Sequence, residues 1–426
     1  MRELKTILFL LIFVSFFVFI GCDEDEDSNP TSPSSVYPGA ADQIQNMLDG
    51  SIAEFQVAGG LVGVKLVGRN DIWIGTTGKA NLNFDVDIEW DDRFKIGSIT
   101  KTYVATVVLQ LVDADSIELD SAIQKYLPDS IAAMIPVHPD TIMTLRSVLN
   151  HTCGLINFNH TPEFQMVQQA SYGSMVWTAV QLLSLTTDSL THKPGTAWNY
   201  CNTGYVYLQL MVEHLTGNSL KHELDTRVFG PVGLPATEYC ELENPPDIVN
   251  GYMDFDRNGV LDIWNDATAV SPTVAMAAGA MVSNAPDMLK WLDALIDGDL
   301  LSAATQVERL KTVPVAPGAP LAFGLGIVDE NPTPGDNQPV LGHIGGIDGF
   351  SASLFKDKLG NNIVVLVNSS APVASLIPAR AFGNPADEIL MRTIEILAGT
   401  KPTSVQSGQS MDFNSVKAYY QGCQTH

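Results

Sequence analysis

A serine and a lysine three residues apart form the first pair in the sequence whose spacing suits catalysis. Ser98 and Lys101 precede an apolar repeat with helical spacing, formed by Val104, Val107, Val108, Leu111 and Val112. Because residues three apart share one face of a helix, Lys101 is expected beside the Ser98 hydroxyl. Burial favours a neutral amine that can accept the serine proton, and a helix N-terminus offers N–H groups to an oxyanion. A helix-capping serine followed by a surface lysine is the alternative.

Two later segments carry groups that complement this pair. Tyr200 and Asn202 are separated by one residue, and His343 precedes Gly345 and Gly346 just before a predicted strand. A tyrosine hydroxyl near a lysine can relay a proton to a leaving group, and an asparagine amide can hold a substrate carbonyl. His343 could supply a hydrogen bond or a positive charge, and the glycines would let a substrate backbone come close. Together these residues indicate nucleophilic catalysis by a serine.

The segments that would position these residues divide the chain into a sheet and a helical insertion. The predicted strands are 61–67, 71–75, 350–356 and 362–368. A helical pattern follows at 387–397, and the residues between the two strand pairs read mostly as helices and loops. We therefore expect an α/β (α+β) fold in which one sheet is built from both ends of the chain.

The expected domain organisation follows from this division. One domain covers residues 39–400, with its sheet part at about 39–97 and 300–400 and its helical part at about 98–299. The polar residues 401–426 are expected to form a tail outside the core.

The N-terminal segment has the features of an export signal. Two basic residues precede a short apolar run at 7–20, which is too short to span a bilayer comfortably. The residues around Cys22 resemble a bacterial lipoprotein signal, which predicts removal of residues 1–21, a lipid on Cys22 and an exported, membrane-anchored protein. A plain signal peptide or an uncleaved anchor is the alternative. Residues 22–38, acidic and then rich in Ser and Pro, are expected to form a tether or merely a solubilising terminus.

The charge balance excludes one class of partner. The 426 residues include 23 Lys and Arg against 48 Asp and Glu, for a formal net charge of −25. Nucleic-acid binding needs a cationic face, so no nucleic acid is expected. With 45% hydrophobic residues the chain is too apolar for a disordered acidic protein. It has no phosphate-binding glycine motif, and we expect no required cofactor.

One acidic loop resembles a calcium-binding loop. Oxygen ligands occur at its positions one, three, five and nine, with glycine at six; these ligands are Asp254, Asp256, Asn258 and Asp262. Position twelve is Asn265 and not the usual bidentate glutamate, with Asp266 next to it. The sequence therefore leaves two alternatives, a calcium site without a role in the reaction and a plain acidic turn.

Five motifs in order resemble the serine β-lactamase-like superfamily, with most similarity to its D-alanyl-D-alanine carboxypeptidase and class C β-lactamase branch. The motifs are Phe-Lys-Ile-Gly-Ser-Ile-Thr-Lys at 94–101, Leu-Asn-His-Thr-Cys-Gly-Leu at 149–155, Tyr-Cys-Asn at 200–202, Ala-Ala-Gly-Ala-Met-Val-Ser at 277–283 and Gly-His-Ile-Gly-Gly at 342–346. The resemblance covers about residues 40–400. It implies an antiparallel sheet flanked by N- and C-terminal helices, a mainly helical inserted domain, and a site in the groove between them.

The resemblance also assigns roles to individual residues. It implies that Ser98 is the acylated nucleophile, Lys101 its partner in proton transfer and Tyr200 the general base or acid. Asn202 would contact substrate and Lys101, while His343 and Gly345 would replace the usual Lys-Thr-Gly or His-Thr-Gly motif in substrate binding. The backbone N–H groups of Ser98 and Gly346 would form the oxyanion hole.

Departures from the family pattern bear on the substrate. Ile344 replaces the threonine that helps to bind a substrate carboxylate, and no Lys or Arg occurs between Lys311 and Lys356. A carboxypeptidase assignment is weakened, and esterase-like or D-aminopeptidase-like hydrolysis remains open beside it; cell-wall peptides and β-lactams are candidate substrates. Cys153 and Cys201 replace serines, and they either form a disulfide or fill small buried spaces.

These observations leave two functional hypotheses. The first is a serine hydrolase that forms an acyl-enzyme on Ser98. The second is a surface-tethered cell-wall or ligand-binding module with the same fold and little turnover. The intact set of Ser98, Lys101, Tyr200 and Asn202 favours the enzyme.

Overall fold

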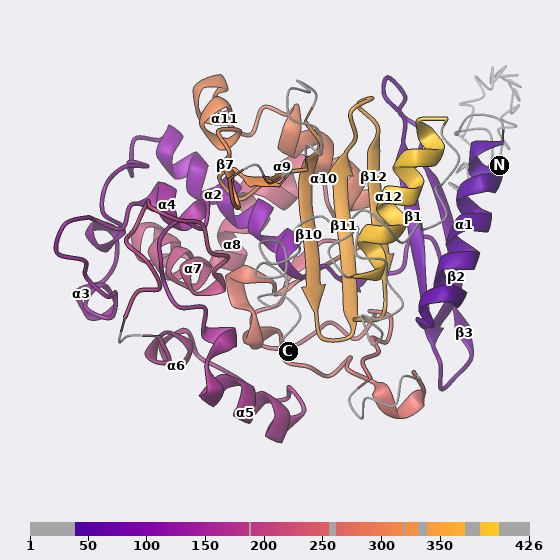
Figure 1. Ribbon diagram of the computed structural model, residues 1–426, viewed down its shortest axis with the longest axis horizontal. Helices are drawn as coiled ribbons and strands as arrows, with labels where there is room; N and C mark the ends of the chain where they lie inside the picture. Colours follow the sequence, from indigo (N-terminus) through magenta and orange to yellow (C-terminus); the bar gives the residue numbers. More distant parts are fainter. Residues whose placement is uncertain are drawn as a thin grey trace, which may run out of the picture.

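One antiparallel sheet forms the centre of the molecule (Figure 1). The computed structural model describes residues 39–186, 189–254, 261–317, 319, 321–330, 339–370 and 384–399. Within these residues, nine strands pair in the order β3-β2-β1-β12-β11-β10-β9-β8-β7. They are β1 (Gly59–Lys65), β2 (Trp73–Asn81), β3 (Val86–Asp87), β7 (Val313–Pro314), β8 (Ala322–Phe323), β9 (Val328–Asp329), β10 (Leu341–Ile347), β11 (Phe350–Lys356) and β12 (Asn362–Val367). Because β1 pairs with β12, the sheet joins both ends of the chain, as the sequence predicts.

The central strands are buried on both faces because successive side chains point to opposite sides of the sheet. On β12, Val364 and Leu366 belong to one apolar core, whereas Ile363, Val365 and Val367 belong to the other. Such strands read as continuous apolar runs, which explains why 362–368 was recognisable in the sequence. β11 occupies the predicted residues, while β2 is longer than predicted and ends at Asn81.

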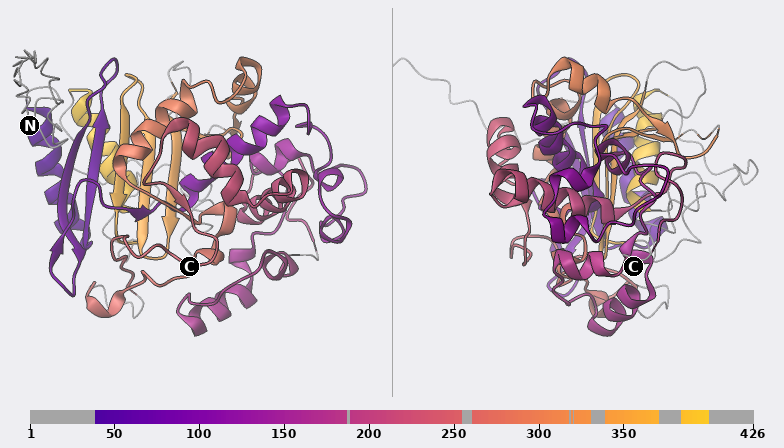
Figure 2. Two further views of the ribbon diagram at one scale, coloured as in Figure 1. Left: turned by 180° about the vertical axis from the view of Figure 1, so that it is seen from behind. Right: turned by 90° about the vertical axis from the view of Figure 1, so that its left-hand side faces the viewer.

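Helices cover both faces of the sheet. α1 (Ala40–Phe55) and α12 (Pro385–Leu397) pack side by side on one face, in front of the strands in Figure 1. α10 (Ala285–Ile296) packs against β1, β11 and β12 on the opposite face, which Figure 2 shows from behind. The N- and C-terminal helices therefore flank the sheet, as the family resemblance implies.

The insertion between the two strand groups is mainly helical and lies at one side of the sheet (Figure 1). Its two long helices, α2 (Thr100–Asp113) and α7 (Asn202–Thr216), pack against each other, and α2 is buried along most of its length. The shorter helices are α3 (Asp129–Ala132), α4 (Leu145–Leu149), α5 (Pro162–Ser171), α6 (Ala179–Ser184), α8 (Leu220–Leu224), α9 (Gly230–Val232) and α11 (Ala303–Arg309). α2 and α7 begin at the two segments that carry the expected catalytic residues.

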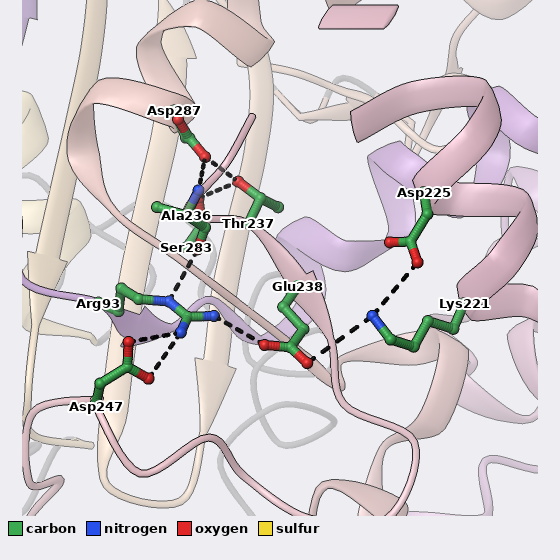
Figure 3. Close-up of polar contacts among 9 residues, drawn as sticks. All are labelled: Arg93, Lys221, Asp225, Ala236, Thr237, Glu238, Asp247, Ser283 and Asp287. Atoms are coloured by element: carbon green, nitrogen blue, oxygen red, sulfur yellow. Dashed lines mark hydrogen bonds and ion pairs between the residues drawn. The ribbon is translucent and has the colours of Figure 1, made fainter. Parts of the chain in front are cut away.

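A second, small sheet draws two of its three strands, β5 (Glu238–Tyr239) and β6 (Met281–Ser283), from the part of the chain expected to be helical. It consists of β4 (Phe94–Lys95), β6 and β5 in that order. Figure 3 shows how Arg93 fixes its edge: the guanidinium donates to the Ala236 carbonyl at 2.9 Å, to Asp247 at 2.7 Å and to Glu238 at 3.2 Å. These contacts tie the strand that leads to Ser98 to the helical insertion.

Several expectations fall outside the described residues. The predicted signal peptide, Cys22 and the tether lie within residues 1–38, and the predicted tail is 401–426. In the part of the chain that the structure does describe, no helix combines the length and apolarity needed to cross a bilayer.

Candidate active site

Ser98 and Lys101 lie beside each other, as their spacing predicts. Ser98 occupies a 3₁₀ turn, Gly97–Ile99, that leads directly into α2, so it precedes the α-helix instead of opening it. The Lys101 ammonium nitrogen lies 3.0 Å from Ser98 Oγ and 2.6 Å from the Ala278 carbonyl oxygen. Lys101 is completely buried, whereas Ser98 is half-buried. The alternative of a surface lysine is therefore wrong.

Two tyrosine rings enclose the Lys101 amine. Its Nζ lies 4.8 Å from the centre of the Tyr200 ring and 5.3 Å from that of Tyr205. The Tyr205 hydroxyl donates to the Leu149 carbonyl at 3.2 Å, and burial raises the Tyr205 pKa above its usual range. Tyr205 therefore stays neutral and serves as a wall of the site, while Tyr200 lies at the N-terminal end of α7, where the family pattern expects the general base or acid.

Asn202 is held at the start of α7 by two other asparagines. Its backbone N–H donates to Asn157 Oδ1 at 3.2 Å, and its side-chain Nδ2 donates to Asn159 Oδ1 at 3.2 Å. Its Oδ1 is buried and accepts no hydrogen bond from the described residues. The amide is thus oriented by its nitrogen, and its oxygen remains available to a substrate N–H. No contact between Asn202 and Lys101 is seen among the described hydrogen bonds.

The glycines at the end of β10 pack directly against the turn that carries Ser98. A Cβ on Gly345 would lie 2.0 Å from the Ile96 carbonyl oxygen, and a Cβ on Gly97 would lie 2.7 Å from the Gly346 nitrogen. Gly97 also has a φ of +50°, a conformation that side chains disfavour. Glycine is required at these positions because two backbones meet here. The close approach places the Gly346 backbone against Gly97, the residue before Ser98.

His343 and His151 are buried and neutral near the lysine. Burial, assisted by the Lys101 charge, lowers the pKa of His343 to about 3 and that of His151 well below its usual range. His343 Nδ1 lies 2.6 Å from the Ile344 carbonyl, and His151 Nδ1 accepts the Cys201 N–H at 3.2 Å. Of the two alternatives for His343, this lowered pKa therefore favours a hydrogen bond over a positive charge at neutral pH. His151 thereby anchors the backbone between Tyr200 and Asn202.

A small pocket, partly open to solvent, brings several predicted residues together. Its polar lining includes Ser98, Asn159, Asn202, Gly346 and Asp348. Of the residues predicted to be catalytic or to bind substrate, four are not part of this lining: Lys101, Tyr200, His343 and Gly345. Asn159 and Asp348 are not predicted by the sequence analysis. Asn159 lies in a 3₁₀ turn of three residues, Phe158–His160, which is too short to show a pattern, and Asp348 reads in the sequence as half of an Asp-Gly turn.

The remaining site predictions have different outcomes. Asp256 and Asn258 lie outside the described residues, so the structure does not test the predicted calcium loop. Of its two described residues, Asp254 is buried and Asp262 is half-buried. No cluster of three or more acidic, histidine or cysteine side chains suited to a metal occurs among the residues described. Cys153 and Cys201 are buried free thiols joined by a hydrogen bond that raises the Cys153 pKa, in keeping with the space-filling alternative.

Comparisons with known proteins agree with the motifs. Residues 48–415 match the family model described as Beta-lactamase. The D-aminopeptidase of Cereibacter sphaeroides is 27% identical over 362 residues, which cover 81% of this chain and 64% of that protein. The D-alanyl-D-alanine-carboxypeptidase/endopeptidase AmpH of Escherichia coli is 24% identical over 328 residues, covering 73% of this chain and 78% of that one.

A solved structure shows the same architecture. The D-amino acid amidase of Ochrobactrum anthropi superposes with a TM-score of 0.69 at 26% identity, covering 84% of this chain and 99% of that chain. The present chain spans less than two thirds of the D-aminopeptidase it matches. Because the family model spans most of the chain, this protein belongs to the beta-lactamase family.

Proposed function

We propose that this protein is a serine hydrolase that cleaves an amide or ester bond through an acyl-enzyme on Ser98. The observation that carries the proposal is the 3.0 Å contact between the fully buried Lys101 amine and the Ser98 hydroxyl. An amine so placed can take the serine proton directly when it is in its unprotonated form.

The reaction would proceed in two halves. Ser98 Oγ attacks the substrate carbonyl while its proton passes to Lys101, and the N–H groups of Ser98 and Gly346 bind the oxyanion. The Tyr200 ring packs over the Lys101 amine, and its centre lies 4.3 Å from the centre of the His151 ring. From this position Tyr200 relays the proton to the leaving group as the substrate bond breaks. Water then attacks the Ser98 ester, releases the acid and restores the serine proton.

The residues around the site favour an amide or ester substrate over a peptide that is recognised by its C-terminal carboxylate. The stretch from 312 to 355, which includes β10, contains no Lys or Arg to bind a carboxylate. The relatives include a D-aminopeptidase and a D-amino acid amidase. D-Amino-acid amides and small esters are therefore the first substrates to assay, followed by D-Ala-D-Ala peptides and β-lactams.

Labelling with a fluorophosphonate tests the nucleophile. The probe should attach once per chain at Ser98, and Ser98→Ala should remove both the label and the turnover while the protein stays folded. A folded protein that neither labels nor hydrolyses any substrate of the panel would favour the alternative binding module.

We also propose that the protein is exported and anchored by lipid on Cys22, on the basis of the signal-like residues 1–22. Metabolic labelling with a palmitate analogue should mark the wild type and not Cys22→Ser. Equal labelling of both proteins, or of neither, would contradict the anchor.

A further inference from the structure

One carboxylate in the pocket has no role in the reaction described above. Asp348 lines the same pocket as Ser98, Asn202 and Gly346 and is only 9% exposed. Its carboxylate forms no hydrogen bond or ion pair with any residue that the structure describes. A buried carboxylate is normally paired, because removing it from water without a partner is costly. A group that arrives with the substrate can supply that partner.

Lys95 interacts electrostatically with Asp348, but no described hydrogen bond or ion pair joins the two side chains. Lys95 is buried, and its ammonium donates to the carbonyls of Thr268 and Val270 at 2.9 Å each. Burial lowers the pKa of Lys95 to about 8, and the charge of Asp348 acts in the opposite direction. Lys95 therefore remains protonated at neutral pH but directs two of its three hydrogens to backbone carbonyls.

The turn itself does not require an aspartate. Asp348 and Gly349 form the two-residue connection between β10 and β11, in which Ile347 pairs with Phe350. The Asp-Gly turns favoured in hairpins need a positive φ at both residues. Here only Gly349 has one, at +84°, so the backbone does not select the Asp348 side chain. Its position in the pocket needs a different explanation.

The position of Asp348 relative to the oxyanion hole limits what it can bind. It follows Gly346 by two residues, which is about 7 Å along an extended chain. The aspartate side chain and one hydrogen bond can cover that distance. A group bound by both residues would therefore carry its positive charge close to the scissile carbonyl. The α-ammonium of an amino-acid amide or ester meets this condition.

We propose that Asp348 is a specificity-determining residue that binds the free ammonium group of the substrate, so that the preferred substrates are amides or esters of amino acids with an unblocked amino group. This inference rests on the proposed hydrolase function. The carboxylate would also repel an acidic substrate group at the same place, which agrees with the lack of a cation in β10.

Three p-nitroanilides test the inference on the wild-type protein. They are D-alanine p-nitroanilide, its N-acetyl derivative, and propanoic acid p-nitroanilide, which lacks the amino group altogether. We expect kcat/KM to be at least about tenfold higher for the free amine than for either neutral compound, as is typical for a charged hydrogen bond. Equal rates, or no hydrolysis of any of the three by a protein that labels at Ser98, would overturn the inference.

Asp348→Asn then assigns the preference to this side chain. The variant should lose about tenfold to a hundredfold in kcat/KM for D-alanine p-nitroanilide and less than about threefold for propanoic acid p-nitroanilide. Asp266→Asn is the matched control, because Asp266 is an exposed carboxylate whose charge also reaches Lys95 but which does not line the pocket. A preference that persists in Asp348→Asn would refute the assignment.

Fluorophosphonate labelling separates failure of this inference from failure of the proposed function, since the probe carries no ammonium. Absence of label on wild-type Ser98 would reject the hydrolase itself. Normal labelling in every variant, without any effect of Asp348 on selectivity, would reject only the ammonium site. If Asp348→Asn does not fold, the three wild-type rates still show whether the protein prefers a substrate with a free amino group.

Discussion

Replacing Lys101 with methionine removes the proton acceptor proposed for Ser98 while keeping a side chain of similar length in a buried position. The Lys101 amine contacts Ser98 Oγ at 3.0 Å and the Ala278 carbonyl at 2.6 Å. A positioned general base typically contributes about a hundredfold to ten-thousandfold in rate, which corresponds to about 3–5 kcal/mol of activation free energy. We therefore expect Lys101→Met to slow Ser98 acylation by at least about a hundredfold.

The same substitution should leave the fold intact. The Ala278 carbonyl loses its hydrogen bond from Lys101, which costs about 1–3 kcal/mol when a buried acceptor is left without a partner. Lys95→Met is the matched control, because Lys95 is also a buried lysine that donates to two backbone carbonyls. It should affect stability to a similar degree and fluorophosphonate labelling by less than about threefold, since Lys95 does not contact Ser98.

Stopped-flow labelling with a fluorescent fluorophosphonate measures the acylation rate, and thermal unfolding measures the fold. The reasoning would be refuted if Lys101→Met acylated at the wild-type rate. It would also be refuted if both lysine variants lost acylation equally, because the loss would then reflect a general effect of removing a buried cation.

Two further predictions concern the backbone and the pH dependence. Gly97→Ala should lower both the stability of the protein and the rate of acylation, because the added Cβ would lie 2.7 Å from the β10 backbone. Gly68 also has a positive φ but faces open space, so Gly68→Ala should cost only about 1–2 kcal/mol of stability and leave labelling unchanged. The folded-state pKa of His343 is about 3 and that of His151 is also lowered, so below pH 6.5 the unfolded chain binds more protons. Stability should therefore fall as the pH drops from about 6.5 towards 3, by up to about 1.4 kcal/mol per pH unit for each histidine. His343→Gln should reduce this slope in thermal unfolding at pH 4–7, and an unchanged slope would contradict the buried neutral state.

The parts of the fold that the sequence predicted are those with a strong repeating pattern. The strands at 350–356 and 362–368 were recognisable because apolar runs flank a polar turn, and the buried helix after Ser98 shows an apolar repeat. The small sheet of β4, β5 and β6 was not predicted, because strands of two or three residues are too short to show a period.

The candidate site was predicted in its residue types and only partly in its electrostatics. Ser98 and Lys101 were placed together by helical spacing, and their contact agrees with it. The neutral state of His343 depends on burial by segments far away in the sequence, which no local pattern reveals. Asp348 was overlooked for a related reason: an Asp-Gly pair predicts a turn, but only the folded chain places its side chain in the pocket of Ser98.

The most direct test of the central claim is to trap the acyl-enzyme. The protein is mixed with an ester or amide that it hydrolyses, quenched with acid within the first turnovers and examined by intact mass and peptide mapping. We predict one acyl group per chain, attached to Ser98, and no adduct in Ser98→Ala. Turnover without any covalent adduct, or an adduct that persists in Ser98→Ala, would contradict the account.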